Sequence, residues 1–188
     1  MASGSDTVGV AGPAGVVSEL GEGRPVIVLA EGFAGSAAHQ ALARRFRVIV
    51  LALANGAAEA GRGAAAWLAQ AGLDEVGVLG AGDLAPAALA AATAAKARSL
   101  VLVSPQGLTE PAAAGPATAV LIGSRDAGQP RDALSRYRRL LPGCRTVLVY
   151  GAGADIAAER PDALASAAGD FLDRQGRFNL MTATMALD

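Results

Sequence analysis

The sequence is poor in histidine, cysteine, aromatic side chains and excess charge of either sign. Its 188 residues include one histidine and one cysteine, and aromatic residues make up 4% of the chain. One cysteine excludes an internal disulfide, and one histidine excludes a histidine-rich metal site. The 16 basic side chains balance 17 acidic ones, for a net charge of −1. The chain therefore has no excess of positive charge with which to bind nucleic acid or an anionic membrane surface.

Long hydrophobic runs are also missing. Glycine, proline or a charged residue interrupts each apolar run before it reaches the ~20 residues that a membrane-spanning helix needs. The first ten residues, MASGSDTVGV, have neither the basic start nor the apolar centre of a secretory signal. We therefore expect a cytoplasmic protein without a membrane span, a nucleic-acid partner, a bound metal or a cofactor.

The chain is rich instead in alanine, which makes up roughly a quarter of it and exceeds ordinary usage. Between alanine-rich amphipathic stretches lie six short apolar runs without polar alternation, a pattern typical of strands buried on both faces. These runs span residues 26–30, 48–53, 76–80, 100–104, 119–123 and 146–150. Their alternation with helical patterns predicts an α/β protein with a mainly parallel sheet and helices on both faces.

Apolar residues at helical spacing mark the predicted helices. Residues 36–46 form one such stretch, with His39 on its apolar face. Residues 132–141 form another, in which Leu134, Tyr137 and Leu141 are expected to point inward and Arg136 and Arg139 outward. Arg136, Arg138 and Arg139 are therefore interpreted as a solvated helix face, and a patch for a phosphate or a partner is the alternative.

The two ends of the chain and one internal connector break the alternation. Residues 7–10 and 16–20, separated by Gly-Pro-Ala-Gly, predict a hairpin that feeds the sheet edge. Residues 105–117 are rich in proline and glycine and too short to form a lid. We therefore expect one domain over residues 1–176, followed by a C-terminal tail at 177–188.

Four segments carry a family resemblance. Residues 24–36 read RPVIVLAEGFAGS, and residues 76–85 read VGVLGAGDLA. Residues 120–126 read VLIGSRD, and residues 147–155 read VLVYGAGAD. In this order they resemble the oxyanion-loop strand, the nucleophile-elbow strand, the acid-bearing strand and the strand before the catalytic histidine of the α/β-hydrolase superfamily. The resemblance covers residues 5–175 and implies an α/β-hydrolase core without a cap domain.

The same resemblance assigns the catalytic positions of the family to residues that lack the needed side chains. In the family, a serine on a strained turn attacks a carbonyl, a histidine takes its proton, and an acid orients the histidine. Here the nucleophile position is Gly82, and the histidine position is Ala154. Only the acid is retained, as Asp126. The resemblance therefore implies a degenerate triad without a covalent mechanism.

The oxyanion loop is altered as well. Its histidine position holds Glu31, which brings a negative charge to the place where an anion would develop. The backbone N–H groups expected to hold that anion belong to Phe33 and Asp83 and do not depend on side chains. We expect Glu31, Phe33, Asp83 and Asp126 to line the remaining pocket, with a small apolar ligand as a candidate occupant.

An atypical hydrolase is the first alternative. Glu31, Asp83 and Asp126 would form an acid–base group if the three carboxylates met in one pocket, because close like charges raise the pKa of at least one of them. An esterase-like reaction would then proceed without the usual nucleophile and base.

The other candidate reactive side chains have simpler interpretations. His39 is interpreted as a packed core histidine, and Cys144 as a buried structural thiol. Ser36 and Ser104 lie near strand ends but not on an elbow, so a turn or cap role is expected for each.

A dinucleotide site is the second alternative. Gly80, Gly82 and Ala85 match G-x-G-x-x-A between a strand and a helix, where glycines let a pyrophosphate approach the helix start. The next strand ends Val-Ser-Pro-Gln, without the acid that should meet the ribose. Asp83 would also place a negative charge beside the phosphates.

The simultaneous replacement of nucleophile and base favours a non-catalytic role. We therefore expect a binding or assembly subunit whose partner is a protein, either a second copy of the chain or a larger complex. An enzyme, if it is one, would be a hydrolase.

Overall fold

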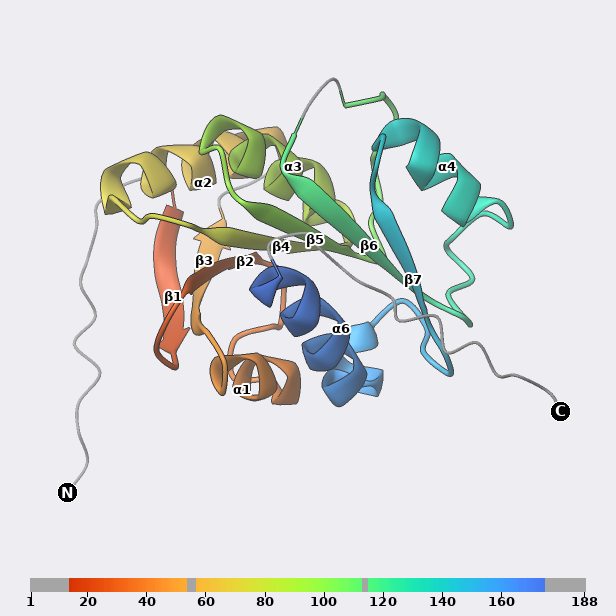
Figure 1. Cartoon of the computed structure of the whole chain (residues 1–188), viewed down its shortest axis with the longest axis horizontal. Helices are drawn as coiled ribbons and strands as arrows, with labels where there is room; N and C mark the ends of the chain where they lie inside the picture. Colours follow the sequence, from red (N-terminus) through yellow and green to blue (C-terminus); the bar gives the residue numbers. More distant parts are fainter. Residues whose placement is uncertain (1–13, 54–56, 113–114, 175–188) are drawn as a thin grey trace, which may run out of the picture.

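The computed structural model describes residues 14–53, 57–112 and 115–174, which Figure 1 traces in sequence colours. Residues 7–10, the first strand of the expected hairpin, lie outside the described residues, as does the expected tail at 177–188.

Within the described residues, seven strands form one sheet. They are β1 (Ala14–Leu20), β2 (Pro25–Leu29), β3 (Arg47–Leu53), β4 (Gly77–Ala81), β5 (Ser99–Val103), β6 (Ala117–Gly123) and β7 (Arg145–Val149). Their order across the sheet is β1-β3-β2-β4-β5-β6-β7, and all neighbours are parallel except β1 and β3. The predicted α/β class with a mainly parallel sheet is confirmed. The one antiparallel strand among the described residues, β1, forms one edge of the sheet.

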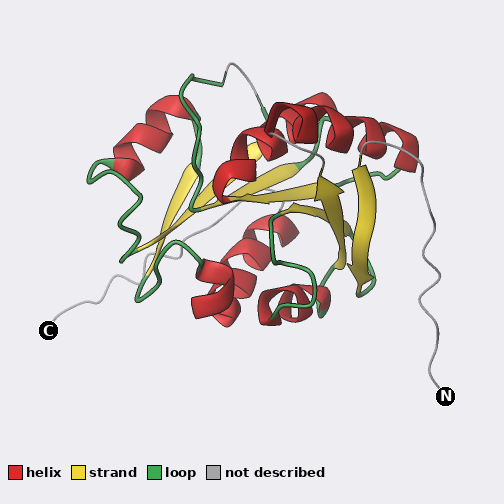
Figure 2. Ribbon diagram, turned by 180° about the vertical axis from the view of Figure 1, so that it is seen from behind, coloured by secondary structure: helices red, strands yellow, loops and turns green. Residues whose placement is uncertain are grey.

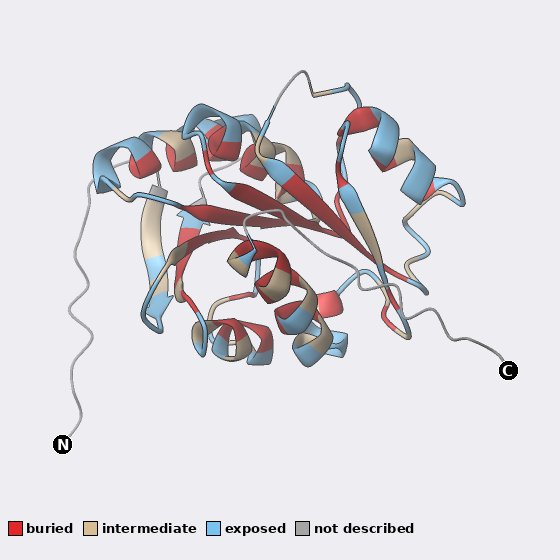
Figure 3. Ribbon diagram, in the orientation of Figure 1, coloured by how far each residue is buried: buried red, intermediate tan, exposed pale blue. Residues whose placement is uncertain are grey.

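Helices cover both faces of this sheet, as Figures 1 and 2 show from opposite sides. One layer contains α2 (Ala57–Ala71), α3 (Ala85–Ala94) and α4 (Ala133–Leu140). The other contains α1 (Ala37–Ala43), α5 (Ile156–Glu159) and α6 (Pro161–Asp173). Each layer encloses its own apolar core, so the central strands are buried along most of their length (Figure 3). None of the helices in the described ranges is long and apolar enough to cross a membrane.

Helix α3 packs against strand β4 through small residues. A Cβ atom at Gly80 would overlap the Cβ of Ala88 and lie 3.4 Å from the Leu84 carbonyl oxygen. A Cβ at Gly61 of α2 would likewise lie 3.2 Å from the Cα of Ala87. The abundant alanine and glycine therefore bring the backbones of α2, α3 and β4 close together.

Strand β7 forms an exposed edge, which corrects the prediction of a strand buried on both faces. Leu148 is 55% exposed, and Tyr150, directly after the strand, is 84% exposed. Leu134 of α4 is also 37% exposed rather than inward, because Tyr137 and Leu140 occupy the buried side of that helix. No strand pairs with the outer edge of β7 within the described ranges, so apolar residues there stay in contact with solvent.

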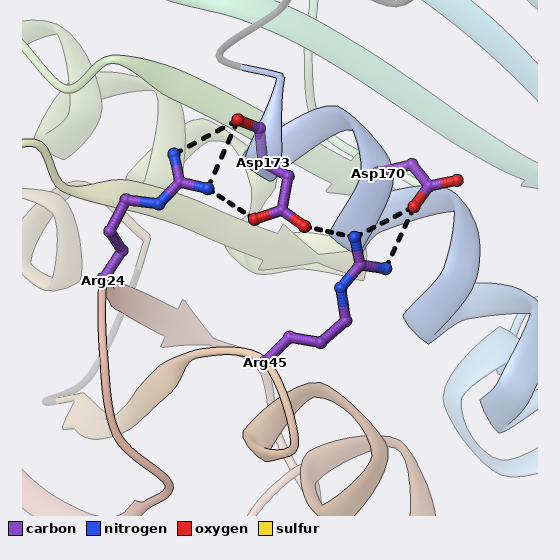
Figure 4. A network of polar contacts seen from close by, with 4 residues as sticks. All are labelled: Arg24, Arg45, Asp170 and Asp173. Atoms are coloured by element: carbon purple, nitrogen blue, oxygen red, sulfur yellow. Dashed lines mark hydrogen bonds and ion pairs between the residues drawn. The ribbon is translucent and has the colours of Figure 1, made fainter.

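Two arginines fix the end of α6 at the amino ends of the strands (Figure 4). Arg24 donates to the backbone carbonyl of Asp173 at 3.2 Å and forms an ion pair with its carboxylate. Arg45 pairs with the same carboxylate and lies 3.0 Å from Asp170 Oδ1. Both guanidinium groups lie over the Phe46 ring, and the Asp173 carboxylate is the main cause that raises the pKa of Arg45.

Gly80→Ala should destabilise the fold. The added methyl group overlaps the Ala88 side chain and pushes α3 away from β4, and overpacking of this kind typically costs about 1–3 kcal/mol. Gly15→Ala in β1 is the matched control, because a Cβ there meets nothing within 4 Å. Denaturant unfolding should show the loss for Gly80→Ala alone, and equal stability of the two variants would contradict the packing argument.

Candidate functional site

The turn between β4 and α3 is where the resemblance puts the nucleophile position, Gly82. Strand β4 ends at Ala81, a single 3-10 turn (η1, Gly82–Leu84) follows, and α3 begins at Ala85. Gly82 has φ +54, in the left-handed region that glycine adopts at little cost. A Cβ at Gly82 would meet nothing within 4 Å, so the space for a side chain is open.

Asp126, which the resemblance assigns to the acid position, follows strand β6. The Oδ1 atom of Asp126 accepts a hydrogen bond from the Gly128 N–H at 3.0 Å, which closes an Asx turn. Its Oδ2 atom is buried and has no hydrogen-bond partner among the described residues. One oxygen therefore holds the turn, whereas the other is left available to a donor.

The loop that carries Ala154 lies directly against the turn that carries Asp126. A Cβ at Gly123 would overlap the Gly153 carbonyl oxygen, so only glycine lets the two segments approach this closely. The Arg125 N–H donates to the Ala152 carbonyl at 2.8 Å. The structure therefore brings the segments that carry Asp126 and Ala154 against each other.

Polar contacts hold this loop in place. The Glu159 carboxylate accepts from the Gly153 N–H at 3.1 Å and pairs with Arg125 at 3.0 Å. Arg160 donates to the Tyr150 carbonyl at 2.9 Å, and Asp155 caps α5 by accepting from the Ala158 N–H at 3.0 Å. A well-supported loop thus presents Ala154, an exposed methyl group with no proton-transfer chemistry.

The other predicted site residues have different surroundings. Glu31 and Asp83 are exposed, whereas Phe33 is 2% exposed and contacts the His39 ring at a centroid distance of 5.9 Å. No group of three acidic, histidine or cysteine side chains could hold a metal ion in the part of the chain that the structure describes. Whether Glu31, Phe33, Asp83 and Asp126 line one pocket stays a prediction.

The two candidate serines differ from each other. Ser36 caps α1, because its Oγ accepts from the His39 N–H at 3.1 Å, which confirms the predicted cap role. Ser104 corrects its prediction: its hydroxyl is buried and has no partner among the described residues. The backbone of Ser104 has φ +42, and its N–H donates a hydrogen bond to the Leu121 carbonyl at 2.8 Å.

His39 is a packed core side chain, as predicted. It is 1% exposed, and its Nδ1 accepts from the Gly35 N–H at 3.1 Å, which assigns the proton of the neutral ring to Nε2. Burial lowers the pKa of His39, and the Val48 backbone raises it by a smaller amount. The Nε2 atom itself has no hydrogen-bond partner of good geometry among the described residues. His39 is therefore neutral in the folded protein near pH 7.

The remaining sequence candidates have structural explanations. Cys144 is buried, and burial raises the pKa of its thiol, as expected of a structural cysteine. Gly80 and Gly82, the glycines of the dinucleotide alternative, are required by the approach of α3 and by the left-handed turn.

Sequence reasoning missed a pocket of about 200 Å³ beside this turn. It lies between the loop after β5, the turn after Asp126, and α4, and includes Gln129, Arg136 and Tyr137 in its lining. No motif marks it, because its walls come from three segments far apart in the chain.

Comparisons with known proteins support the fold. No protein-family model matches the chain, and no curated protein matches it in sequence. An α/β-hydrolase enzyme from the metagenome of sediments of the Mar Chica lagoon, Morocco, superposes with a TM-score of 0.72 at 18% identity, covering 88% of this chain and 98% of that chain. A thermophilic esterase from Thermogutta terrifontis, solved with malate bound, gives 0.69 at 15% identity, with coverage of 87% and 94%.

A carboxylesterase from Bacillus subtilis gives a TM-score of 0.66 at 13% identity, covering 87% of this chain and 92% of that chain. These likenesses show that the chain has the α/β-hydrolase fold, which confirms the resemblance seen in the sequence.

Protonation of His39 should weaken the fold on mild acidification. Because the folded pKa lies below the ordinary value of 6.5, the unfolded chain binds the proton first as pH falls, and stability declines below about pH 6.5 until the folded pKa is passed. His39→Asn should be less stable by about 1–2 kcal/mol because it leaves a small cavity, but it should lose this pH dependence. Unfolding free energies between roughly pH 5.5 and 7.5, above the titration of ordinary carboxylates, test this, and parallel curves would contradict it.

Proposed function

We propose that the chain is a non-catalytic α/β-hydrolase-fold protein that acts as a binding or assembly subunit. The observation that carries this proposal is Gly82, which has the left-handed backbone of a nucleophile elbow and no side chain. The supported loop around Ala154 adds to it, because a methyl group occupies the position of the base. Without a nucleophile and a base, acyl transfer by the covalent route cannot proceed.

The structural neighbours are hydrolases and esterases, so the fold alone would suggest an enzyme. Fold does not determine function, because catalysis depends on the side chains that the fold positions. Those side chains are what this chain lacks at Gly82 and Ala154.

One pair of observations favours a second candidate, an atypical hydrolase. The Ser104 hydroxyl and Asp126 Oδ2 are both buried and have no partner among the described residues. They belong to the carboxyl ends of neighbouring strands, β5 and β6. If a substrate reached both groups, the protein could act on it with this hydroxyl and this carboxylate in place of the usual triad.

The assembly part of the proposal rests on the β7 edge. Leu148 near the end of β7 and Tyr150 directly after the strand are both largely exposed. The outer N–H and C=O groups of an edge strand are ready to pair with another strand. We propose a second copy of the chain as the partner, with the two β7 strands antiparallel about a twofold axis. This arrangement also keeps the two Arg145 side chains apart, because equal residues then lie at opposite ends.

The catalytic proposal predicts that the wild-type chain neither turns over p-nitrophenyl acetate or butyrate nor reacts with a fluorophosphonate. The double variant Gly82→Ser/Ala154→His should gain fluorophosphonate labelling, because it restores a nucleophile and a base in a retained backbone. The serine should cost about 1–2 kcal/mol of stability, because its backbone is left-handed although its Cβ meets open space.

The two single variants are the controls and should stay unlabelled. Wild-type turnover that disappears in Ser104→Ala or Asp126→Ala would overturn the proposal in favour of the atypical hydrolase. A folded double variant that remains unlabelled would contradict the proposal that Gly82 and Ala154 occupy the nucleophile and base positions.

The assembly proposal predicts a concentration-dependent dimer in sedimentation experiments. Leu148→Asp should raise the dissociation constant about tenfold or more, because it buries a charge at the centre of the interface. Val17→Asp on β1 is the matched control, since Val17 is 56% exposed on the opposite edge of the sheet. A monomer at all concentrations, or equal weakening by both variants, would exclude the β7 interface.

A further inference from the structure

The pocket beside the Gly82 turn has walls that are built and held together. Its volume is about 200 Å³, enough for a molecule of several non-hydrogen atoms. The Pro105 carbonyl oxygen lies 2.5 Å from the Tyr137 hydroxyl and 3.2 Å from Gln129 Nε2. Tyr137 OH also lies 2.8 Å from Gln129 Oε1. The Pro105 carbonyl thus links the loop after β5, the turn after β6, and α4, so the walls of this half-open pocket are held in place.

The pocket also has one positive charge and no negative one in its lining. Arg136 is half-buried on the α4 wall, and its Nη2 donates to the Leu108 carbonyl at 3.0 Å. A guanidinium has five N–H donors, so this single bond leaves most of its capacity unused. No acidic side chain lines the pocket within the residues that the structure describes.

The charge distribution around the pocket is polarised. Asp126 lies in the turn after β6, where the Gly128 N–H holds its Oδ1. Burial is the main cause that raises the pKa of Tyr137, and the Asp126 charge adds to it, whereas the Arg136 charge and the Gln129 hydrogen bond lower this pKa. Arg136 lies on the opposite, helical side. An anionic group in the pocket is therefore drawn toward α4, and the Tyr137 hydroxyl stays protonated as a neutral polar wall.

We propose that this pocket binds a small carboxylate-bearing molecule, with its carboxylate on the Arg136 guanidinium and its polar body beside Gln129 and Tyr137. A planar guanidinium matches a carboxylate with two parallel hydrogen bonds, which gives this pairing its geometric specificity. The inference rests on the proposed binding role of the chain and adds a ligand class to it. The site is adjacent to the vacant catalytic position and does not use it.

Isothermal titration calorimetry with acetate, succinate and glutarate tests the proposal, at ionic strength held constant with sodium chloride. At least one acid should bind saturably at millimolar concentration, and succinamide should bind at least tenfold more weakly than succinate because it lacks the charge. Equal binding of succinate and succinamide, or no saturable binding of any of the three acids, would overturn the proposal.

Arg136→Gln should weaken binding about tenfold or more, whereas Arg138→Gln should leave it unchanged. Arg138 is the matched control, because it is exposed on the same helix and bonds Thr146 instead. Gln106→Glu is a second variant that keeps the internal contacts, since Gln106 is exposed at the pocket wall. It should also weaken carboxylate binding through repulsion, so the proposal stays testable if Arg136→Gln does not fold. Retained affinity in both folded variants would refute it.

Esterase turnover measured on the same samples separates this inference from the proposed function. If the chain neither turns over esters nor binds a carboxylate, the pocket proposal is wrong and the proposed non-catalytic role still stands. Turnover with p-nitrophenyl esters would overturn the non-catalytic role, and the Arg136 variants would still report whether the pocket takes a carboxylate.

Discussion

The close approach of helix α3 to strand β4 is the contact on which the site depends. Gly80 admits the Ala88 side chain against the strand, so the chain must turn from strand to helix within η1. Gly82 makes that turn in the left-handed region, and its carbonyl oxygen accepts from the Gln106 N–H at 3.0 Å. One packing contact therefore fixes both the empty elbow and the loop that forms a wall of the neighbouring pocket.

The fold could be predicted from the sequence because a sheet buried on both faces needs continuous apolar strands. Each of the six apolar runs became a strand, and their order with the intervening helices matched the α/β-hydrolase pattern. The pattern could not tell which run would end the sheet, so β7 was expected to be buried. The prediction for Leu134 is wrong for a related reason. The apolar residues Leu134, Tyr137 and Leu140 lie on one short helix, and the pattern alone does not show that Tyr137 and Leu140 are the buried ones.

The candidate site could be predicted only where position in the strand order determines it. Gly82, Asp126 and Ala154 follow the ends of three strands, so their places could be inferred from the resemblance. The loop that carries Ala154 lies against the Asp126 turn because its backbone carbonyls pack directly on Gly123. Residue types alone do not reveal such a contact between backbones. The left-handed conformation and unpartnered hydroxyl of Ser104 were equally invisible, since serine rarely adopts such a backbone.

Glycine at the elbow changes what the turn contributes to the protein. A serine held at φ near +54 would store strain, and such strain persists at active sites because the chemistry requires it. Glycine removes the strain and the nucleophile together, yet the turn still receives the Gln106 N–H and the loop around Ala154 keeps its polar contacts. In the proposed non-catalytic role, the backbone of this turn supports its surroundings. Since Gln106 and Pro105 belong to the adjacent pocket, the turn also supports the walls that we propose hold a small carboxylate.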